Sequence, residues 1–111
     1  MDLEKIIEGW ITAGNSYDTE KYLDFYHENA VLDDPSVGRK FNGKKGIMEY
    51  YESYFIGYKT QTKIISIAIK DPDRASLEVE FSGDFPEGKL RGSFEFIFGE
   101  GKITHLSADL I

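Results

Sequence analysis

The stretch ASLEVEFSGDFPEGKLRGSFEFIFGEGK, residues 75–102, contains two runs in which apolar and polar side chains alternate. A period of two places every second side chain on the same face of a β-strand. Turn-forming residues, GDFPEGK and GEGK, follow the two runs. We therefore predict two antiparallel strands that each bury one face. Their apolar positions are Ala75, Leu77, Val79 and Phe81 in the first strand and Leu90, Gly92, Phe94, Phe96 and Phe98 in the second.

The same pattern continues on both sides of this hairpin. From Thr60 onward Ile65, Ile67 and Ile69 alternate with smaller or polar residues, which predicts one more strand before the hairpin. The sequence DPDR, residues 71–74, places proline in a favoured turn position. Residues 103–110 form a last strand. The second half of the chain is therefore predicted to be an antiparallel sheet.

The first half of the chain has helical spacing instead. We expect one helix that ends near Gly14 and Asn15, and a second helix for which Asp18 is the N-cap. A short strand follows at residues 30–32, and a third helix begins with GKKGIMEYYESYF, residues 43–55. The apolar positions are Leu3, Ile6, Ile7, Trp10 and Ile11 in the first helix, Tyr22, Leu23, Phe25 and Tyr26 in the second, and Ile47, Tyr50, Tyr51 and Tyr54 in the third.

This order of elements predicts the fold class. Residues 1–111 are expected to form one α+β domain, in which three N-terminal helices pack on one face of a curved, mostly antiparallel sheet. The sequence contains no internal repeat, no linker and no low-complexity segment.

Composition excludes several classes of function. A net charge of −7 argues against binding to nucleic acid and against binding to an anionic membrane surface. The chain has no cysteine, which removes disulfides, thiolate nucleophiles and cysteine-rich zinc sites, and we expect a cytoplasmic protein. Aromatic residues make up 14% of the chain, and such rings can fill a core or line an apolar cavity.

The pair Asp33–Asp34 precedes Pro35 and admits two interpretations. Aspartate before proline is common in turns, because its side chain bonds to nearby backbone. A carboxylate at the end of a strand that faces an aromatic cavity can instead act as a general base on a carbon acid. Alternation along the strand directs Asp33 to the opposite face, so that Asp33 is expected to be a surface charge.

Four segments resemble the NTF2-like superfamily of cystatin-like cone folds, to which the SnoaL-like polyketide cyclases and the ketosteroid isomerases belong. They are GNSYD at residues 14–18, FYHENAVLDDP at 25–35, FNGKKGIMEYY at 41–51 and GKITHLSADL at 101–110. The resemblance covers nearly the whole chain and is closest to the bacterial ketosteroid isomerases. These motifs mostly specify the fold, and functions within the superfamily differ widely.

The resemblance implies a site. Asp34 takes the position of the isomerase general base, and Tyr26 and Tyr51 take positions behind the pocket. The oxyanion-hole tyrosine of the isomerases is replaced by Trp10, and their oxyanion-hole acid falls on Phe94, or on Ser93 without a gap. The expected pocket residues are Trp10, Tyr26, Tyr51, Phe81, Phe94, Phe96 and Leu106, and no metal or organic cofactor is expected.

Two functions remain open at this point. The first is cofactor-independent proton transfer on an apolar, carbonyl-bearing small molecule, with Asp34 as the base. The second is a non-catalytic ligand-binding or association module, which the missing acid favours. The water-activating Asp-Arg-Asp set of the superfamily's epoxide hydrolases fits poorly, because Arg91 and Asp109 are out of phase with the inward positions of their strands. We also expect a homodimer through the outer sheet face, although Glu78, Glu80 and Glu95 on that face would need partners.

Overall fold

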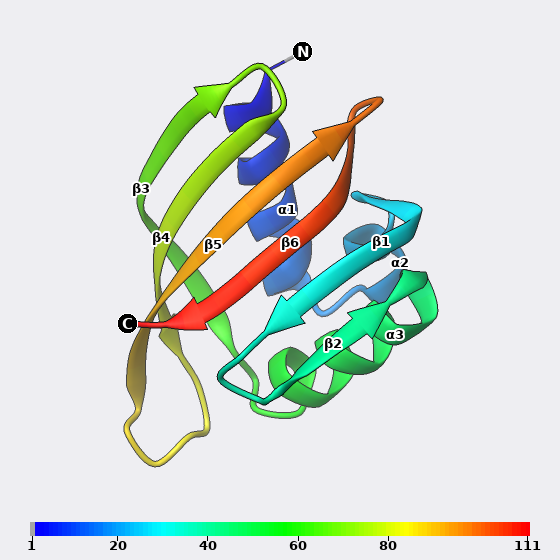
Figure 1. Cartoon of the computed structure of the whole chain (residues 1–111). Coiled ribbons are helices and arrows are strands. Elements are labelled where there is room, and N and C mark those ends of the chain that lie inside the picture. Colours follow the sequence, from blue (N-terminus) through cyan, green and yellow to red (C-terminus); the bar gives the residue numbers. More distant parts are fainter. Residues whose placement is uncertain (1) are drawn as a thin grey trace.

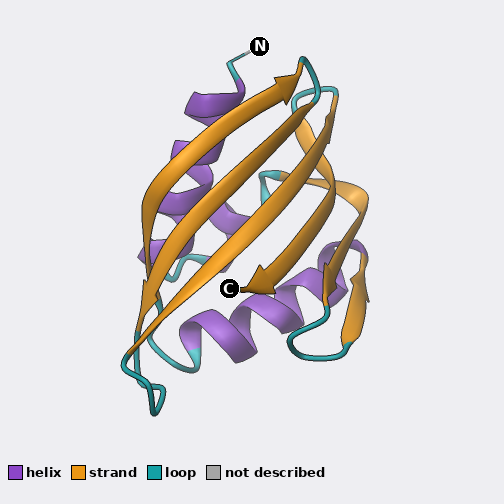
Figure 2. Cartoon of the chain, turned by 60° about the vertical axis from the view of Figure 1, so that its left-hand side comes forward, coloured by secondary structure: helices purple, strands orange, loops and turns teal. Residues whose placement is uncertain are grey.

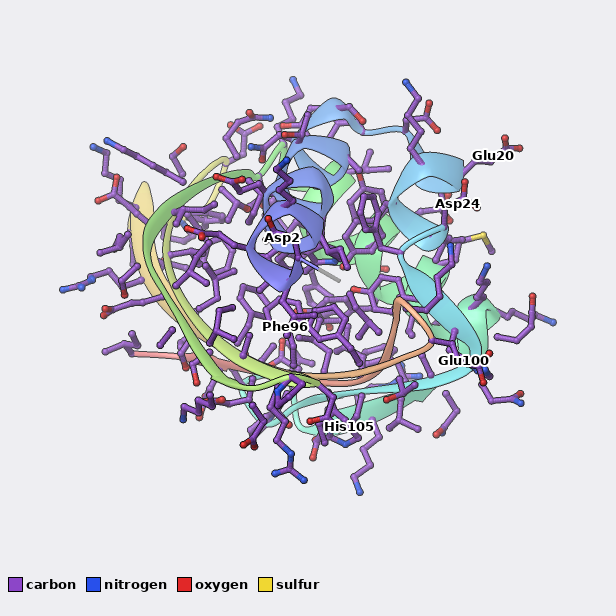
Figure 3. All side chains as sticks on the ribbon, turned by 90° about the horizontal axis from the view of Figure 1, so that it is seen from above. Asp2, Glu20, Asp24, Phe96, Glu100 and His105 are labelled. Carbon is purple, nitrogen blue, oxygen red and sulfur yellow. The ribbon has the colours of Figure 1, made fainter. Side chains whose placement is uncertain are left out.

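A computed structural model describes residues 2–111, and its helices lie on the concave side of one curved sheet (Figures 1 and 3). The sheet has the strand order β2-β1-β6-β5-β4-β3, in which only β1 and β6 are parallel among the described strands. The predicted α+β fold, with helices on a curved and mostly antiparallel sheet, is confirmed. The elements are α1 (Leu3–Ser16), α2 (Thr19–Leu23), β1 (Tyr26–Asp34), β2 (Arg39–Asn42), α3 (Gly43–Tyr51), η1 (Glu52–Ile56), β3 (Gln61–Asp71), β4 (Arg74–Ser82), β5 (Lys89–Gly99) and β6 (Lys102–Leu110).

Helix α1 packs its apolar face into the sheet. Ile7 and Trp10 are almost completely buried on this face, and Asp2 caps the helix by accepting a hydrogen bond from the Lys5 amide. The helix passes the predicted stop at Gly14 and ends at Ser16. Asn15 then joins α1 to β3, because its side-chain amide donates to the Thr62 carbonyl at 2.9 Å and its Oδ1 accepts from the Thr62 amide at 2.7 Å.

Helix α2 is shorter than predicted. Asp18 is its N-cap, as expected, and accepts a hydrogen bond from the Lys21 amide. The helix ends at Leu23, whereas helical spacing had predicted that it continues through Tyr26. The reason is that the chain joins the sheet here: the Phe25 carbonyl accepts a hydrogen bond from the Ile103 amide of β6 at 2.8 Å.

Strand β1 is longer than the predicted residues 30–32, and it carries the aspartate pair to the edge of the core. It runs from Tyr26 to Asp34 beside β6, and the short strand β2 pairs with its outer edge. Ala30, Leu32 and Asp34 are buried at alternate positions, so that Asp34 is the last inward side chain of the strand.

Strand β3 does not keep Ile65, Ile67 and Ile69 on a common buried face. Ile64 pairs with Val79 and Ser66 pairs with Glu78, which leaves Ile65 as the extra residue of a β-bulge. The bulge shifts the alternation by one residue, so that Ile64 and Ile67 pack against the core while Ile65 is 45% exposed.

Helix α3 changes its winding at Tyr51. The next five residues, Glu52–Ile56, form the π-helix η1, closed by a hydrogen bond from the Gly57 amide to the Glu52 carbonyl at 2.9 Å. Such wide turns often occur at functional sites. Here the turn follows Tyr51 and buries Phe55, whose ring packs edge-on against Phe81 of β4. No helix within residues 2–111 is long and apolar enough to cross a membrane.

Candidate functional site

Figure 2 shows the C-terminal end of β6 near α3. A cavity of about 230 Å³ is lined by residues of both elements. Its walls come from the ends of β1 and β6, from α3 and η1, and from the hairpin that joins β4 to β5. Tyr58 and Leu110 are among its exposed lining residues and mark its mouth. The other lining residues are Asp34, Ser36, Val37, Tyr50, Tyr54, Phe55, Thr60, Phe81, Phe85, Pro86, Leu90, Phe94, Ala108 and Asp109.

Asp34 is the buried charged side chain of this cavity and is only 5% exposed. Its Oδ1 accepts hydrogen bonds from the Ser36 amide at 3.0 Å and from the Ser36 hydroxyl at 2.5 Å. Its Oδ2 accepts from the Tyr50 hydroxyl at 2.8 Å. A carboxylate offers about four acceptor positions, so Oδ2 retains about one for a bound molecule. Asp34 therefore bonds to its own turn, as the turn interpretation predicts, and its carboxylate also faces the cavity.

Tyr50 contacts Asp34 in the candidate site, and sequence reasoning did not place it there. It is 4% exposed on α3, and burial, followed by the nearby charge of Asp34, raises its pKa well above the ordinary value. Tyr50 is therefore a neutral donor that holds the Asp34 carboxylate. Its helical spacing with Ile47 and Tyr54 predicted a core ring, and nothing in the sequence distinguishes a core tyrosine from one that meets a carboxylate sixteen residues away.

Of the predicted pocket residues, Phe81 and Phe94 line the cavity together with Asp34. Gly92 leaves the space that the Phe81 ring uses, since a Cβ at Gly92 would lie 2.4 Å from Cε2 of Phe81. The remaining predicted residues lie in the core behind the cavity rather than on its wall; they are Trp10, Tyr26, Tyr51, Phe96 and Leu106. Figure 3 shows Phe96 on the side of the sheet that faces α1.

Trp10 occupies the space between α1 and the phenylalanine-rich strand. Its ring packs edge-on against Phe94 and Phe96, with centroids 5.0 Å and 5.2 Å away. Its indole N–H donates to the Tyr26 hydroxyl at 3.0 Å, and the Tyr26 and Tyr22 hydroxyls lie 2.6 Å apart. The single donor of Trp10 is therefore already used within the core.

Tyr51 is also buried in the core and does not line the cavity. Its hydroxyl donates to the Gly14 carbonyl at 2.8 Å, and its ring stacks on Tyr22 at 4.0 Å. Burial raises the pKa of Tyr51 to about 12 and also raises that of Tyr26. The hydroxyls of Tyr26 and Tyr51 thus hold the helices together behind the cavity.

The other charged candidates lie apart. Arg91 points to the outer face, where its guanidinium pairs with Glu78 at 2.7 Å, while Asp109 is exposed at the cavity rim. Asp33 alternates with Asp34 and lies opposite Lys40 and Ser107 in the sheet. Within residues 2–111, no three His, Asp or Glu side chains gather closely enough to hold a metal ion.

Comparison with solved structures places the fold. A candidate polyketide cyclase from Sinorhizobium meliloti aligns with a TM-score of 0.84 at 20% identity, over 94% of this chain and 93% of its own. An NTF2-like protein of unknown function from Cytophaga hutchinsonii aligns with a TM-score of 0.81 at 15% identity, over 100% of this chain and 91% of its own. A protein with a ketosteroid isomerase-like fold from Catenulispora acidiphila, in complex with trimethylamine, aligns with a TM-score of 0.81 at 12% identity, over 93% of this chain and 82% of its own.

A search of curated proteins found no match to the sequence. The family model of the SnoaL-like domain matches residues 7–106, which include every strand from β1 to β5 and most of β6. The curved sheet with helices on its concave face is the fold of the NTF2-like structure above, and the family match shows that the chain belongs to the SnoaL-like domain family.

Proposed function

We propose that the chain binds an apolar small molecule in the cavity and moves a proton between carbon positions of that molecule, with Asp34 as the general base. The observation that carries the proposal is the position of Asp34: a carboxylate that is 5% exposed, held by Tyr50 and Ser36, and set in an aromatic wall. Such a carboxylate is oriented before the substrate arrives, which proton transfer requires.

The size of the cavity limits the substrate. A cavity of about 150 Å³ lined by apolar side chains binds benzene, and pockets for drug-sized ligands begin near 300 Å³. At about 230 Å³ the present cavity fits a molecule with one ring and a few further atoms. The proposed substrate is therefore a small, carbonyl-bearing ring compound, in which the carbonyl makes the neighbouring C–H bond acidic.

Exchange of carbon-bound hydrogen tests this proposal. Acetophenone fits the size of the cavity and has enolisable methyl protons, and NMR in D₂O follows their replacement by deuterium. We expect the protein to accelerate this exchange and Asp34→Asn to remove the acceleration, because an amide does not accept the proton. Asp33→Asn removes the same charge one residue away, outside the cavity, and should exchange like the unmodified protein. Acceleration that survives Asp34→Asn would exclude Asp34 as the base.

A non-catalytic binding module is the second candidate, and one observation favours it. An enolate needs donors at its oxygen, yet Trp10 gives its N–H to Tyr26 and Phe94 has no acid group. The same experiment separates the two functions. Acetophenone that shifts the NMR signals of cavity residues without faster exchange would show that the cavity binds this ketone without moving its proton.

We further propose a cytoplasmic homodimer that pairs through the outer sheet face. Support comes from the exposed Ile65 and Ile69 of β3, and from the glutamates of this face, which have cationic partners within the chain. These pairs are Glu78 with Arg91 at 2.7 Å, Glu80 with Lys89 at 3.7 Å and Glu95 with Lys70 at 3.8 Å. Light scattering tests the dimer, and Ile65→Lys should make the protein monomeric. A monomer before the substitution would contradict it.

A further inference from the structure

The charge on the cavity wall is negative only. Asp34 and Asp109 carry carboxylates, and no lysine, arginine or histidine is among the lining residues. None of the ion pairs that form within residues 2–111 includes Asp34. The groups of Ser36 and Tyr50 that donate hydrogen bonds to Asp34 are neutral. No cation of the protein therefore balances the charge of the buried carboxylate.

The rest of the wall also suits a cation. Aromatic rings from α3, from η1 and from the hairpin that joins β4 to β5 line the cavity, and the face of such a ring attracts an organic cation within about 6 Å. A tetraalkylated or ring-bound nitrogen spreads its charge over an apolar surface, which matches an apolar wall better than a strongly hydrated metal ion does. These rings belong to Tyr50, Tyr54, Phe55, Phe81, Phe85 and Phe94.

The chemistry leads to the same class of molecule. Removing a proton from a neutral ketone leaves an anion, and the hydroxyl of Tyr50, a donor near Asp34, is already used to hold the carboxylate. Removing a proton beside a positively charged C=N group leaves a neutral enamine, which needs no oxyanion hole. A cationic substrate therefore removes the need for the donors that Trp10 and Phe94 do not supply.

We propose that the cavity selects a small organic monocation and that a positively charged C=N group, in place of a neutral carbonyl, activates the C–H bond from which Asp34 takes the proton. This inference rests on the proposed role of Asp34 as a base. In the step, the proton moves to Oδ2 of Asp34 and the C–H electron pair forms a C=C bond. The π pair of the C=N group moves to nitrogen, so that the cation becomes a neutral enamine. Where a C=C bond adjoins the carbon that lost the proton, the product is a dienamine, and return of the proton to its far carbon completes an isomerisation.

Charge selection is tested with two probes of equal shape. Choline and 3,3-dimethylbutan-1-ol differ in one atom, a quaternary nitrogen against a quaternary carbon, and NMR titration gives both affinities. We expect choline to bind at least about tenfold more tightly, because it gains the attraction of Asp34 and of the rings. Asp34→Asn should reduce the difference to the share that the rings contribute, and Asp33→Asn should keep it. Equal affinity of the two probes for the unmodified protein would overturn the proposal, and this comparison needs no variant.

The chemical step is tested with 1,2-dimethylpyridinium, whose C2 methyl protons exchange through a neutral enamine. We expect the protein to accelerate this exchange in D₂O in a manner that Asp34→Asn removes, and more strongly than it accelerates exchange of acetophenone. Exchange of acetophenone without selection for choline would overturn this inference and leave the base role of Asp34 standing. Exchange of neither compound would overturn the base role itself, together with the step.

Discussion

Filling the cavity should stabilise the protein and abolish binding at the same time. Ala108 lies on β6 opposite Phe94, is 4% exposed, and lines the cavity. Replacement by leucine adds three carbon atoms that point into the empty space. Burial of each carbon contributes about 0.8 kcal/mol, and fixing the side chain costs about 0.5 to 1 kcal/mol, so that the free energy of unfolding should rise by about 1.5 kcal/mol.

The assay is thermal unfolding combined with NMR titration of choline. For a domain of this size the expected rise in Tm is about 6 °C. Ala108→Leu should also weaken choline binding at least about tenfold, because the side chain occupies the space of the ligand. The matched control is Ala75→Leu. Ala75 is 1% exposed in the core and does not line the cavity, so the same added atoms should lower the free energy of unfolding by about 1 to 3 kcal/mol.

Two results would refute this reasoning. If Ala108→Leu lowers the Tm as much as Ala75→Leu does, the space beside Ala108 is already filled in solution. If Ala108→Leu raises the Tm and choline still binds with unchanged affinity, choline binds elsewhere on the protein.

Three further predictions concern the surroundings of the cavity. Tyr50→Phe keeps the ring but removes the hydrogen bond to Asp34. Denaturant titration should show a free energy of unfolding that is lower by about 1 to 2 kcal/mol. An unchanged value would show that this hydrogen bond is absent in solution. Asn15→Ala removes both hydrogen bonds that join α1 to Thr62 and should lower the free energy of unfolding by about 2 kcal/mol. Amide hydrogen exchange should accelerate first at the start of β3. Uniform acceleration over the chain would contradict the local role of Asn15. The third prediction concerns alkaline pH. Burial raises the pKa of Tyr51 to about 12 in the folded state, while an unfolded tyrosine ionises near pH 10. The stabilisation from this group is therefore complete below pH 10 and is lost as the pH rises toward 12. Tyrosinate absorbance should therefore rise together with the loss of circular dichroism, whereas full ionisation near pH 10 in a folded protein would contradict the burial of these tyrosines.

Much of the fold could be predicted because its pattern is local. The alternation through Val79 and Phe94 specifies strands with one buried face, and Asp18 specifies a helix start through its own side chain. The bulge at Ile65 could not be predicted in this way. It depends on how β3 pairs with β4, and the isoleucines on both sides of it fit either register.

The candidate site could be predicted only in part, for a related reason. Asp34 was singled out because the resemblance to the isomerases places it at their general base and because the end of a strand can direct its side chain toward a cavity. Tyr50 was missed because it contacts Asp34 only through the packing of α3 against β1. The spacing of residues along either segment of the sequence does not indicate this packing. Trp10 and Phe96 were placed on the wall by position alone, whereas the size of their rings fills the space between α1 and the sheet.

Intermolecular NOEs test whether the cavity holds a small molecule beside Asp34. With methyl-labelled protein and bound choline, we expect NOEs from the choline methyl protons to the methyl groups of Val37, Leu90 and Ala108, which line the cavity. NOEs to Ile6 and Ala13 instead, in the surface groove between α1 and α2, would show that choline binds elsewhere. So would the absence of any NOE to the cavity methyl groups when choline saturates the protein.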